Sequence, residues 1–315
     1  MLKQTVLGID FTSAPRTQKP ITGVLATLAP TPGPVAVLQA HTLLRAKTWA
    51  AFEAWFVPGH GVAPANDTLY AAIDAPLSFP AVFWQALGWG EASGRGWRAY
   101  AKRLSKMTMA EFEALVKQYS EARLVGQKLP YRLTDTLTRS SSPVRLYRVP
   151  VGRMAFKLWP VLLRRPEGFS VLPVAPLPGA PCVLLEAYPA LVARACVGRA
   201  PYKSDTRALQ TSAHRDARQV ILSQLQAPAD SEGLSGLAPY GIRVELDAQM
   251  QEALLEDATG DALDALLACV QGAWAVRQKT LSGAPYGIPE AAEAQEGWIV
   301  DPASLTAIDD WRANR

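Results

Sequence analysis

The sequence is poor in the residues that build zinc sites and disulfide frameworks. It holds three cysteines and three histidines among 315 residues. The cysteines, at positions 182, 196 and 269, are odd in number and show no CxxC spacing, so neither a disulfide framework nor a zinc site is predicted. The histidines, at positions 41, 60 and 214, fit no ligand spacing either. A reducing cytoplasm fits this cysteine usage best.

Long apolar segments are missing as well. No run of eighteen apolar residues occurs, so we expect no transmembrane helix and no membrane partner. The first residues lead directly into a predicted core strand, without a separate apolar segment and cleavage site, so we expect no secretory signal. The composition, 49% hydrophobic and 19% charged, is that of an ordinary globular protein, long enough for one large domain or two small ones.

The excess of basic residues is small overall, at a net charge of +4, but it is concentrated in one region. Residues 91–167 hold 16 Lys and Arg against 6 Asp and Glu, a local balance of +10. The remainder holds 16 basic and 22 acidic residues, a balance of −6. A basic block beside an acidic remainder predicts a phosphate-binding surface next to a metal-binding one, with a nucleic acid as partner. The alternative is a solvated face on a helical insertion.

Three apolar runs predict buried strands that end on an acid: residues 5–10 ending at Asp10, 69–74 ending at Asp74, and 182–186 ending at Glu186. Two further strands are predicted over 21–28 and 35–41, joined as a hairpin by the Pro- and Gly-rich residues 30–34. A short amphipathic helix is predicted over 48–56. The chain therefore begins with the element order β-β-β-α-β.

A largely helical, basic insertion is expected between the fourth and fifth strands. The predicted division is a core over residues 1–80 and 181–300, the insertion over about 81–180, and a C-terminal tail over 301–315. These elements predict one α/β domain over 1–300, whose mixed sheet has five strands flanked by helices.

The acids at the strand ends are of the kind that binds hard divalent cations. Mg²⁺ and Mn²⁺ prefer carboxylate oxygens, and two such ions roughly 3.5–4 Å apart can activate water and stabilise the leaving oxygen in phosphodiester hydrolysis. The carboxyl ends of strands in an open sheet collect such groups. Asp261 and Asp264 lie three residues apart at the start of an apolar helix, so both should face the sheet. The sequence therefore predicts a catalytic metal site of Asp10, Asp74, Asp261 and Asp264, with Glu186 as a further catalytic acid.

Each acid also has a structural interpretation. Asp261 follows a glycine and can cap its helix, where Asp264 adds favourable charge near the helix dipole. Asp10 and Asp74 precede residues typical of turns and can hydrogen-bond the backbone there. Glu is a poor turn former, so this interpretation is weakest for Glu186.

Six short motifs follow one another along the chain: GIDFTSAP (residues 8–15), IDAPLSFP (73–80), YRLTD (131–135), EAYPAL (186–191), DALDALLA (261–268) and EGWIV (296–300). Together they resemble a family of uncharacterised proteins that is described as predicted nucleases with a ribonuclease H-like fold. The resemblance covers roughly residues 5–300 in the same order, and EAYPAL and DALDALLA are its more specific parts.

The resemblance implies a ribonuclease H-like core of five strands, three of them in antiparallel succession. In that superfamily, acids on the first strand, the fourth strand and the last helix bind Mg²⁺ or Mn²⁺, which carries over to Asp10, Asp74, Asp261 and Asp264. The closing Asp-x-x-Asp resembles that of Holliday-junction resolvases. Glu186 matches the family's motif, but the wider superfamily does not require an acid there. It is therefore implied as an additional ligand or as a group that supports the ligands.

Three basic residues are candidates for binding the substrate. Arg132 lies in the insertion, three residues before Asp135, and its planar guanidinium suits bidentate contact with a phosphate. The alternative is an Arg132–Asp135 pair that holds the insertion on the core. Lys203 and Arg207 follow the fifth strand and are further candidates for phosphate contacts.

The leading hypothesis is a metal-dependent nuclease that acts on DNA or RNA, with Mg²⁺ or Mn²⁺ as its cofactor. The second is a phosphotransferase of the actin and sugar-kinase type, because residues 8–13 resemble the first phosphate loop of those proteins. They normally need a duplicated core and a second Gly-rich loop, and the sequence shows neither. The third hypothesis is a non-catalytic nucleic-acid-binding module with the same fold.

Overall fold

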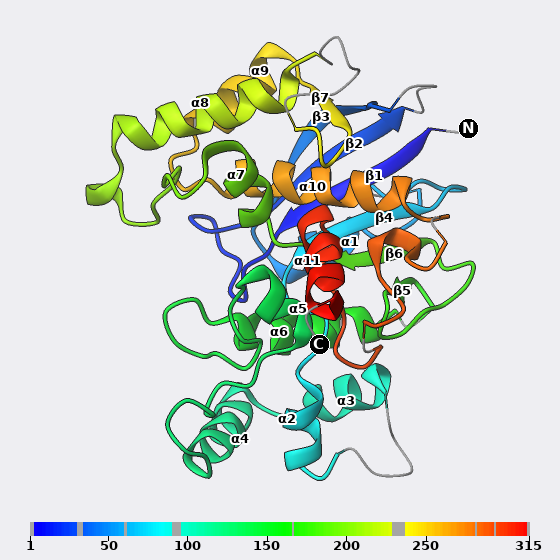
Figure 1. The fold of residues 1–315 in the computed structure, drawn as a ribbon, viewed down its shortest axis with the longest axis vertical. Coiled ribbons are helices and arrows are strands. Elements are labelled where there is room, and N and C mark those ends of the chain that lie inside the picture. The colour runs from blue at the N-terminus through cyan, green and yellow to red at the C-terminus, as the bar shows by residue number, and fades with distance from the viewer. Residues whose placement is uncertain are drawn as a thin grey trace.

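A seven-stranded sheet with helices on both faces forms the framework of the protein (Figure 1). The computed structural model describes residues 3–29, 34–59, 62–89, 96–165, 167–228, 237–280, 282–292 and 294–313. The strands are β1 (Gln4–Asp10), β2 (Ile21–Ala29), β3 (Ala36–Ala46), β4 (Leu69–Asp74), β5 (Phe169–Val171), β6 (Cys182–Glu186) and β7 (Ile242–Glu245). They lie side by side in the order β5-β6-β4-β1-β2-β3-β7.

The sheet is mixed, as predicted, but larger than predicted. The β1–β2 and β2–β3 pairs are antiparallel, and the other four pairs are parallel. The predicted hairpin of β2 and β3 is confirmed, although residues 30–33 of its turn lie outside the described residues. The prediction of five strands is wrong, because β5 and β7 add one strand to each edge. With three and four residues, these strands are too short to show apolar periodicity in the sequence.

The helices are α1 (Trp49–Ala54), α2 (Ala81–Ala86), α3 (Trp97–Leu104), α4 (Met109–Glu121), α5 (Leu133–Thr138), α6 (Val151–Leu163), α7 (Ala190–Val197), α8 (Ser212–Gln226), α9 (Ala248–Glu256), α10 (Asp261–Arg277) and α11 (Pro302–Ala313), with short 3-10 turns η1 (Arg207–Leu209) and η2 (Pro285–Gly287). The segment predicted as a helical insertion holds α2 to α6 and also the edge strand β5. Helices α2, α3 and α4 form the lower part of the molecule in Figure 1.

Alternating residues of each strand enter two separate cores, as the period of a strand requires. Val6 of β1 and Tyr70 of β4 pack with residues of α7 to α10. Leu7 and Leu69, their neighbours in sequence, pack with residues of α1 and of the insertion helices. The two faces of the sheet are therefore both buried, which explains why its central strands read as continuous apolar runs.

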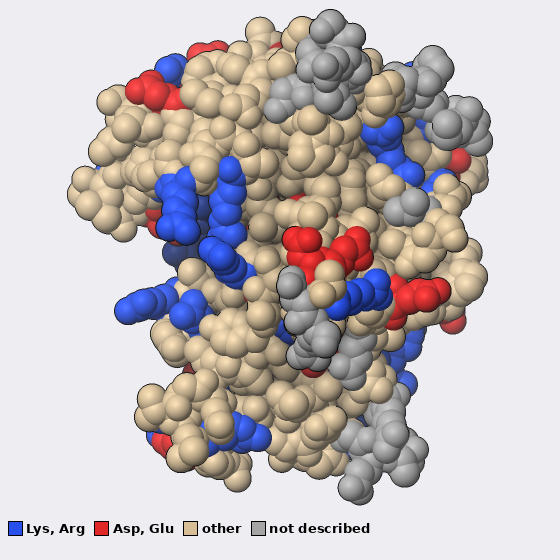
Figure 2. All heavy atoms as spheres, viewed as in Figure 1, with Lys and Arg blue, Asp and Glu red and all other residues tan. Residues whose placement is uncertain are grey.

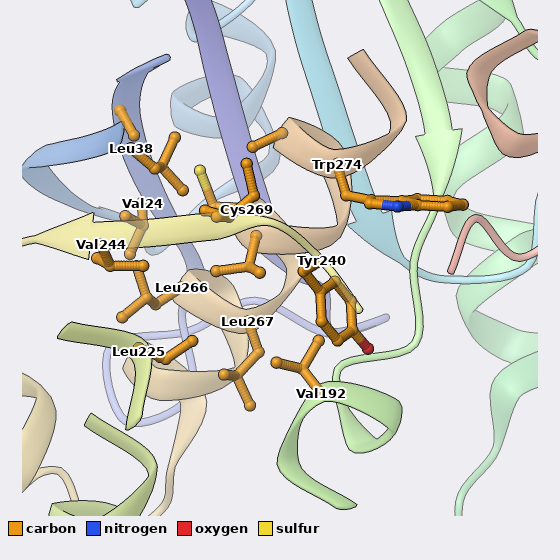
Figure 3. Packing of buried hydrophobic residues seen from close by; sticks show 14 of the residues in the cluster. Val24, Leu38, Val192, Leu225, Tyr240, Val244, Leu266, Leu267, Cys269 and Trp274 are labelled. Atoms are coloured by element: carbon orange, nitrogen blue, oxygen red, sulfur yellow. The ribbon is translucent and has the colours of Figure 1, made fainter. Parts of the chain in front are cut away.

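Helix α10 fills the centre of the first core, where Leu266 and Leu267 lie among side chains of the sheet and of α7 and α8 (Figure 3). Its backbone rests directly on β1, since a Cβ atom at Gly8 would lie 2.0 Å from the carbonyl oxygen of Ala265. Further along the helix, a Cβ at Gly272 would lie 2.9 Å from that of Ala72 in β4. These two close contacts place the first turn of α10 over the carboxyl ends of β1 and β4.

The C-terminal residues, expected to be a tail, form α11 over Pro302–Ala313. Ile308 of this helix is fully buried, so the segment is part of the packed structure. Within the described ranges, no helix is both long and apolar enough to cross a membrane.

Candidate functional site

Asp10 and Asp74 lie side by side at the carboxyl ends of β1 and β4. The strands are parallel and Asp10 is the register partner of Asp74. Both side chains point to the face of α10, because Gly8 and Ala72, two residues earlier in each strand, meet that helix. Neighbouring strands lie about 4.8 Å apart, so the two carboxylates are close. No other described residue forms a hydrogen bond or ion pair with either of them.

Asp261 and Asp264 occupy the first turn of α10, and each is held by a lysine. The Nζ atom of Lys19 lies 2.7 Å from Oδ1 of Asp261. The Tyr202 hydroxyl donates to Oδ1 of Asp264 at 2.5 Å, and the ammonium of Lys203 donates to its Oδ2. Both aspartates are buried. The helix therefore faces the sheet with its acids, as its sequence predicts.

The four aspartates form one group, which we call the acid cluster, and their negative charges act on one another. Burial, and after it repulsion from Asp264, raises the pKa of Asp74 from 3.8 to about 7, although Lys203 opposes the shift. Burial, then Asp264 and Asp261, raises the pKa of Asp10 well above its usual range. Burial also raises the pKa of Asp261, against the effect of Lys19. Such a concentration of negative charge is stabilised by any cation that enters it.

The interpretation of Asp261 as a helix cap is wrong. The capping acid is Asp257, whose Oδ2 accepts from the backbone N–H of Ala262 at 2.8 Å. Its Oδ1 accepts from the backbone and hydroxyl of Thr259. Gly260, at the N-cap, has a φ of 75° that favours glycine. Because Asp257 supplies the cap, the carboxylate of Asp261 is directed instead to Lys19.

The oxygen donors of the acid cluster suit Mg²⁺ or Mn²⁺, but they are not closed around an ion. In the part of the chain that the structure describes, no group of three or more His, Cys, Asp or Glu side chains is placed to hold a metal. Lys19 and Lys203 supply positive charge instead. The side chain of Lys203 is 40% exposed, whereas that of its partner Asp264 is buried. Asp10, Asp74 and Asp264 are the carboxylates of the cluster that could hold a divalent cation.

Glu186, the third acid at a strand end, is engaged elsewhere. It has the strand parity of Cys182 and Leu184, which belong to the core on the opposite face from Asp10 and Asp74. Its Oε1 and Oε2 accept from Arg132 at 2.6 and 2.8 Å. Oε2 also accepts from the backbone N–H of Leu77 at 2.9 Å. Glu186 thus has both carboxylate oxygens bound by protein donors, unlike Asp10 and Asp74.

Arg132 is buried and joins Glu186 to Asp135, a group that we call the arginine network. Its Nε and Nη2 donate to Asp135 at 2.9 and 2.7 Å, and Nη1 also donates to the carbonyl of Glu296 at 3.2 Å. All five N–H groups of the guanidinium therefore have acceptors. Burial lowers the pKa of Arg132, but the charges of Asp135 and Glu186 raise the pKa by a larger amount. Arg132 therefore stays protonated. The geometry therefore supports the alternative in which Arg132 pairs with Asp135 and holds the insertion on the core.

Two cavities lie along the site and share the walls Ala190, Tyr202 and Lys203. The first, about 280 Å³, is lined by Asp74 and Asp264 and, on another side, by the arginine network. The second, about 500 Å³, extends away from the acids along α7. Arg207, predicted to contact phosphate, is exposed in η1 and lines neither cavity.

Comparison with protein families found one match, to proteins of unknown function (DUF429), over residues 29–292. The chain belongs to the DUF429 family. No curated protein and no solved structure matched it. In this DUF429 member, Asp74, Asp261 and Asp264 lie within the matched stretch, whereas Asp10 precedes it.

Sequence reasoning missed two residues that hold the acid cluster in this DUF429 member. Lys19 lies in the loop between β1 and β2 and also binds Asp205, with 2.8 Å between Nζ and Oδ1. Tyr202 precedes Lys203 and binds the same carboxylate. Neither residue belongs to a recognisable motif. The sequence shows only that Lys19 lies in the loop after the strand that ends at Asp10, and that Tyr202 follows helix α7.

Proposed function

We propose that this protein is a Mg²⁺- or Mn²⁺-dependent nuclease that hydrolyses phosphodiester bonds in DNA or RNA. One observation carries the proposal. Asp10 and Asp74 are register partners at the carboxyl ends of two parallel strands, and the first turn of α10 brings Asp264 to them. Asp10 and Asp74 have no donor among the described residues and are repelled by Asp264, which is costly to the fold, and a divalent cation would offset that cost.

The order of the strands supports a ribonuclease H-like core as part of this proposal. The five strands predicted from the sequence lie together in the order β6-β4-β1-β2-β3. The first three strands of the chain are antiparallel in succession, and β4 and β6 continue the sheet in parallel with β1. β5 and β7 are additions at the two edges.

The chemistry divides between the cation and the chain. A bound Mg²⁺ or Mn²⁺ would lower the pKa of a water and stabilise charge on the phosphate oxygens. Asp10, Asp74 and Asp264 would hold that cation, and Tyr202 orients Asp264 by donating its hydroxyl to Oδ1. Lys203, which donates to Asp264 and lines both cavities, would supply positive charge beside a bound phosphate. The arginine network lines the same cavity, where its side chains bind one another.

The phosphotransferase hypothesis receives little support. The described strands form a single sheet, not the duplicated core that such enzymes use. The binding-module hypothesis has one observation in its favour, because Lys19 and Lys203 already supply countercharge to two of the four acids. A measurement of cleavage separates it from the nuclease.

The test is cleavage of single-stranded, duplex and four-way-junction DNA and of RNA by the purified chain with Mg²⁺ or Mn²⁺. We expect cleavage of at least one substrate, abolished by EDTA and by Asp10→Asn or Asp74→Asn. Asp67→Asn is the matched control, since Asp67 is exposed in the loop before β4. Equal cleavage by wild type and Asp10→Asn, or none by wild type on any substrate, rejects the nuclease.

A further inference from the structure

A cavity lined by basic side chains adjoins the acid cluster. It has a volume of about 500 Å³, and its walls include Arg139, Arg194, Arg199 and Lys203 but no acid. Figure 2 shows Lys and Arg side chains gathered on both sides of a hollow in the region of α7 and the loop after it. We call this cavity the basic groove.

The arginines reach the groove from two segments that are distant in sequence. Arg139 ends α5 with a φ of 55°, a left-handed conformation that non-glycine residues adopt infrequently. Arg194 lies in the last turn of α7, and Arg199 follows that helix after Gly198. Cations at the carboxyl ends of two helices are favoured by the helix dipoles, which explains how like charges gather here without an acidic partner.

The charges of the groove are largely uncommitted. Among the described residues, no side-chain hydrogen bond or ion pair is formed by Arg139 or Arg199, and both are exposed. Arg194 is fixed by donating to the carbonyl of Thr138 at 3.1 Å and to the Tyr188 hydroxyl at 3.0 Å. Its guanidinium also lies over the Tyr188 ring. The groove thus combines one anchored arginine with two that are free to bind a ligand.

The groove leads directly to the acids. It shares Tyr202 and Lys203 with the cavity that Asp74 and Asp264 line, and Lys203 donates to Asp264. A ligand that spans both cavities must carry negative charge along the groove and one group that reacts at the acids. A polynucleotide strand, with a phosphate at every residue, meets both requirements.

We propose that the basic groove binds the phosphate backbone of the nucleic acid on one side of the bond to be cut, through Arg139, Arg194 and Arg199. This inference rests on the proposed nuclease function. It assigns the substrate contact to the α5 and α7 ends, and not to the buried Arg132 or to the basic residues of the insertion helices as a whole.

The test is binding of a fluorescein-labelled single-stranded oligonucleotide to the full chain in EDTA, followed by anisotropy at several salt concentrations. Arg139→Gln with Arg199→Gln should weaken binding by roughly tenfold or more. The slope of log affinity against log salt should fall by about 1.4, which is about 0.7 for each lost phosphate contact. Because neither side chain has a fixed partner, this double variant should fold normally, and circular dichroism checks that it does.

The matched control is Lys102→Gln with Lys106→Gln, which removes two exposed charges from α3 and its end. Helix α3 lies away from the groove in Figure 1. Equal weakening by both double variants would overturn the proposal, since binding would then depend on the total charge of the protein and not on the groove. Displacement of the oligonucleotide by poly-glutamate as effectively as by unlabelled oligonucleotide would overturn it too, in favour of an acidic protein partner.

The result is independent of cleavage. Loss of binding in the arginine variant without any cleavage by wild type leaves the groove assigned and rejects the nuclease. Cleavage by wild type, with unchanged binding and cleavage in the arginine variant, keeps the nuclease and rejects the groove.

Discussion

Two groups of carboxylates lie near the carboxyl ends of neighbouring strands, and they differ in how many hydrogen-bond donors and cations surround them. In the arginine network, Glu186 and Asp135 enclose Arg132, which uses all of its N–H groups. In the acid cluster, four aspartates share two lysines, and the pair formed by Asp10 and Asp74 has no donor among the described residues. The carboxylates of the network are neutralised by protein donors, whereas Asp10 and Asp74 are not neutralised by any described residue.

This difference shows that the position of an acid at a strand end is not enough to predict its role. Asp74 and Glu186 end adjacent parallel strands and look alike in sequence. Asp74 faces α10 and other acids, and Glu186 faces an arginine. The residues packed against each strand end decide the role: Arg132 makes Glu186 part of a stabilising ion pair, and α10 leaves Asp74 among other acids.

The largest effect is expected from removing the centre of the arginine network. Arg132→Met leaves Glu186 and Asp135 buried without a countercharge, and should lower the free energy of unfolding by about 3–5 kcal/mol. Urea denaturation measures the loss. The control is Arg215→Gln, which breaks an exposed pair with Glu256 and should cost about 0–1 kcal/mol. Similar losses in both variants would show that the network is no more important than a surface pair.

Gly8→Ala tests the contact that positions the acid cluster. The added Cβ meets backbone atoms of α10, at 2.0 Å from the Ala265 oxygen and 2.3 Å from the Cys269 nitrogen, so the helix must shift. We expect a loss of about 1–3 kcal/mol or more in urea denaturation. Gly272→Ala should cost less, because its Cβ meets mainly side chains. The order of the two losses would be reversed if α10 did not rest on β1 at Gly8.

The pH dependence of stability distinguishes the acid cluster from a satisfied network. The pKa of Asp74 rises from 3.8 to about 7 on folding, so the folded state binds the proton more tightly than the unfolded chain. Its contribution to stability is therefore present below about pH 4 and is lost as pH rises through 7. In EDTA, Asp74→Asn should be more stable than wild type by about 4 kcal/mol at pH 8 and nearly equal to it at pH 4. A constant difference across this range contradicts the shift.

The smallest effect is expected from Lys19, which binds Asp261 and Asp205 at the edge of the cluster. Lys19→Gln should cost about 1 kcal/mol or less, because the pair is partly exposed. It should also tighten Mn²⁺ binding, measured by calorimetry, since a cation is removed from beside the acids. Weaker Mn²⁺ binding in this variant would mean that Lys19 supports the site and does not compete with the metal.

The positions of the main strands and of α10 follow from the sequence, because their apolar runs are long enough to be recognised. The two edge strands could not be predicted, since Phe169–Val171 and Ile242–Glu245 are too short to show an alternation of apolar and polar residues. Helix α11 was expected to be a tail, but its residues Leu305 and Ile308 pack on the core formed by residues far away in the sequence.

The sequence by itself determined which acids end strands and that Asp261 and Asp264 share one helical face. Only the tertiary structure decided that Asp74 joins Asp10 while Glu186 joins Arg132. The strand Cys182–Glu186 is buried on both faces, so its sequence carries no alternation from which the direction of Glu186 could be read. The pairing of β6 with β4 and the packing of α5 beyond the strand end supply that direction, and both depend on residues far apart in the chain.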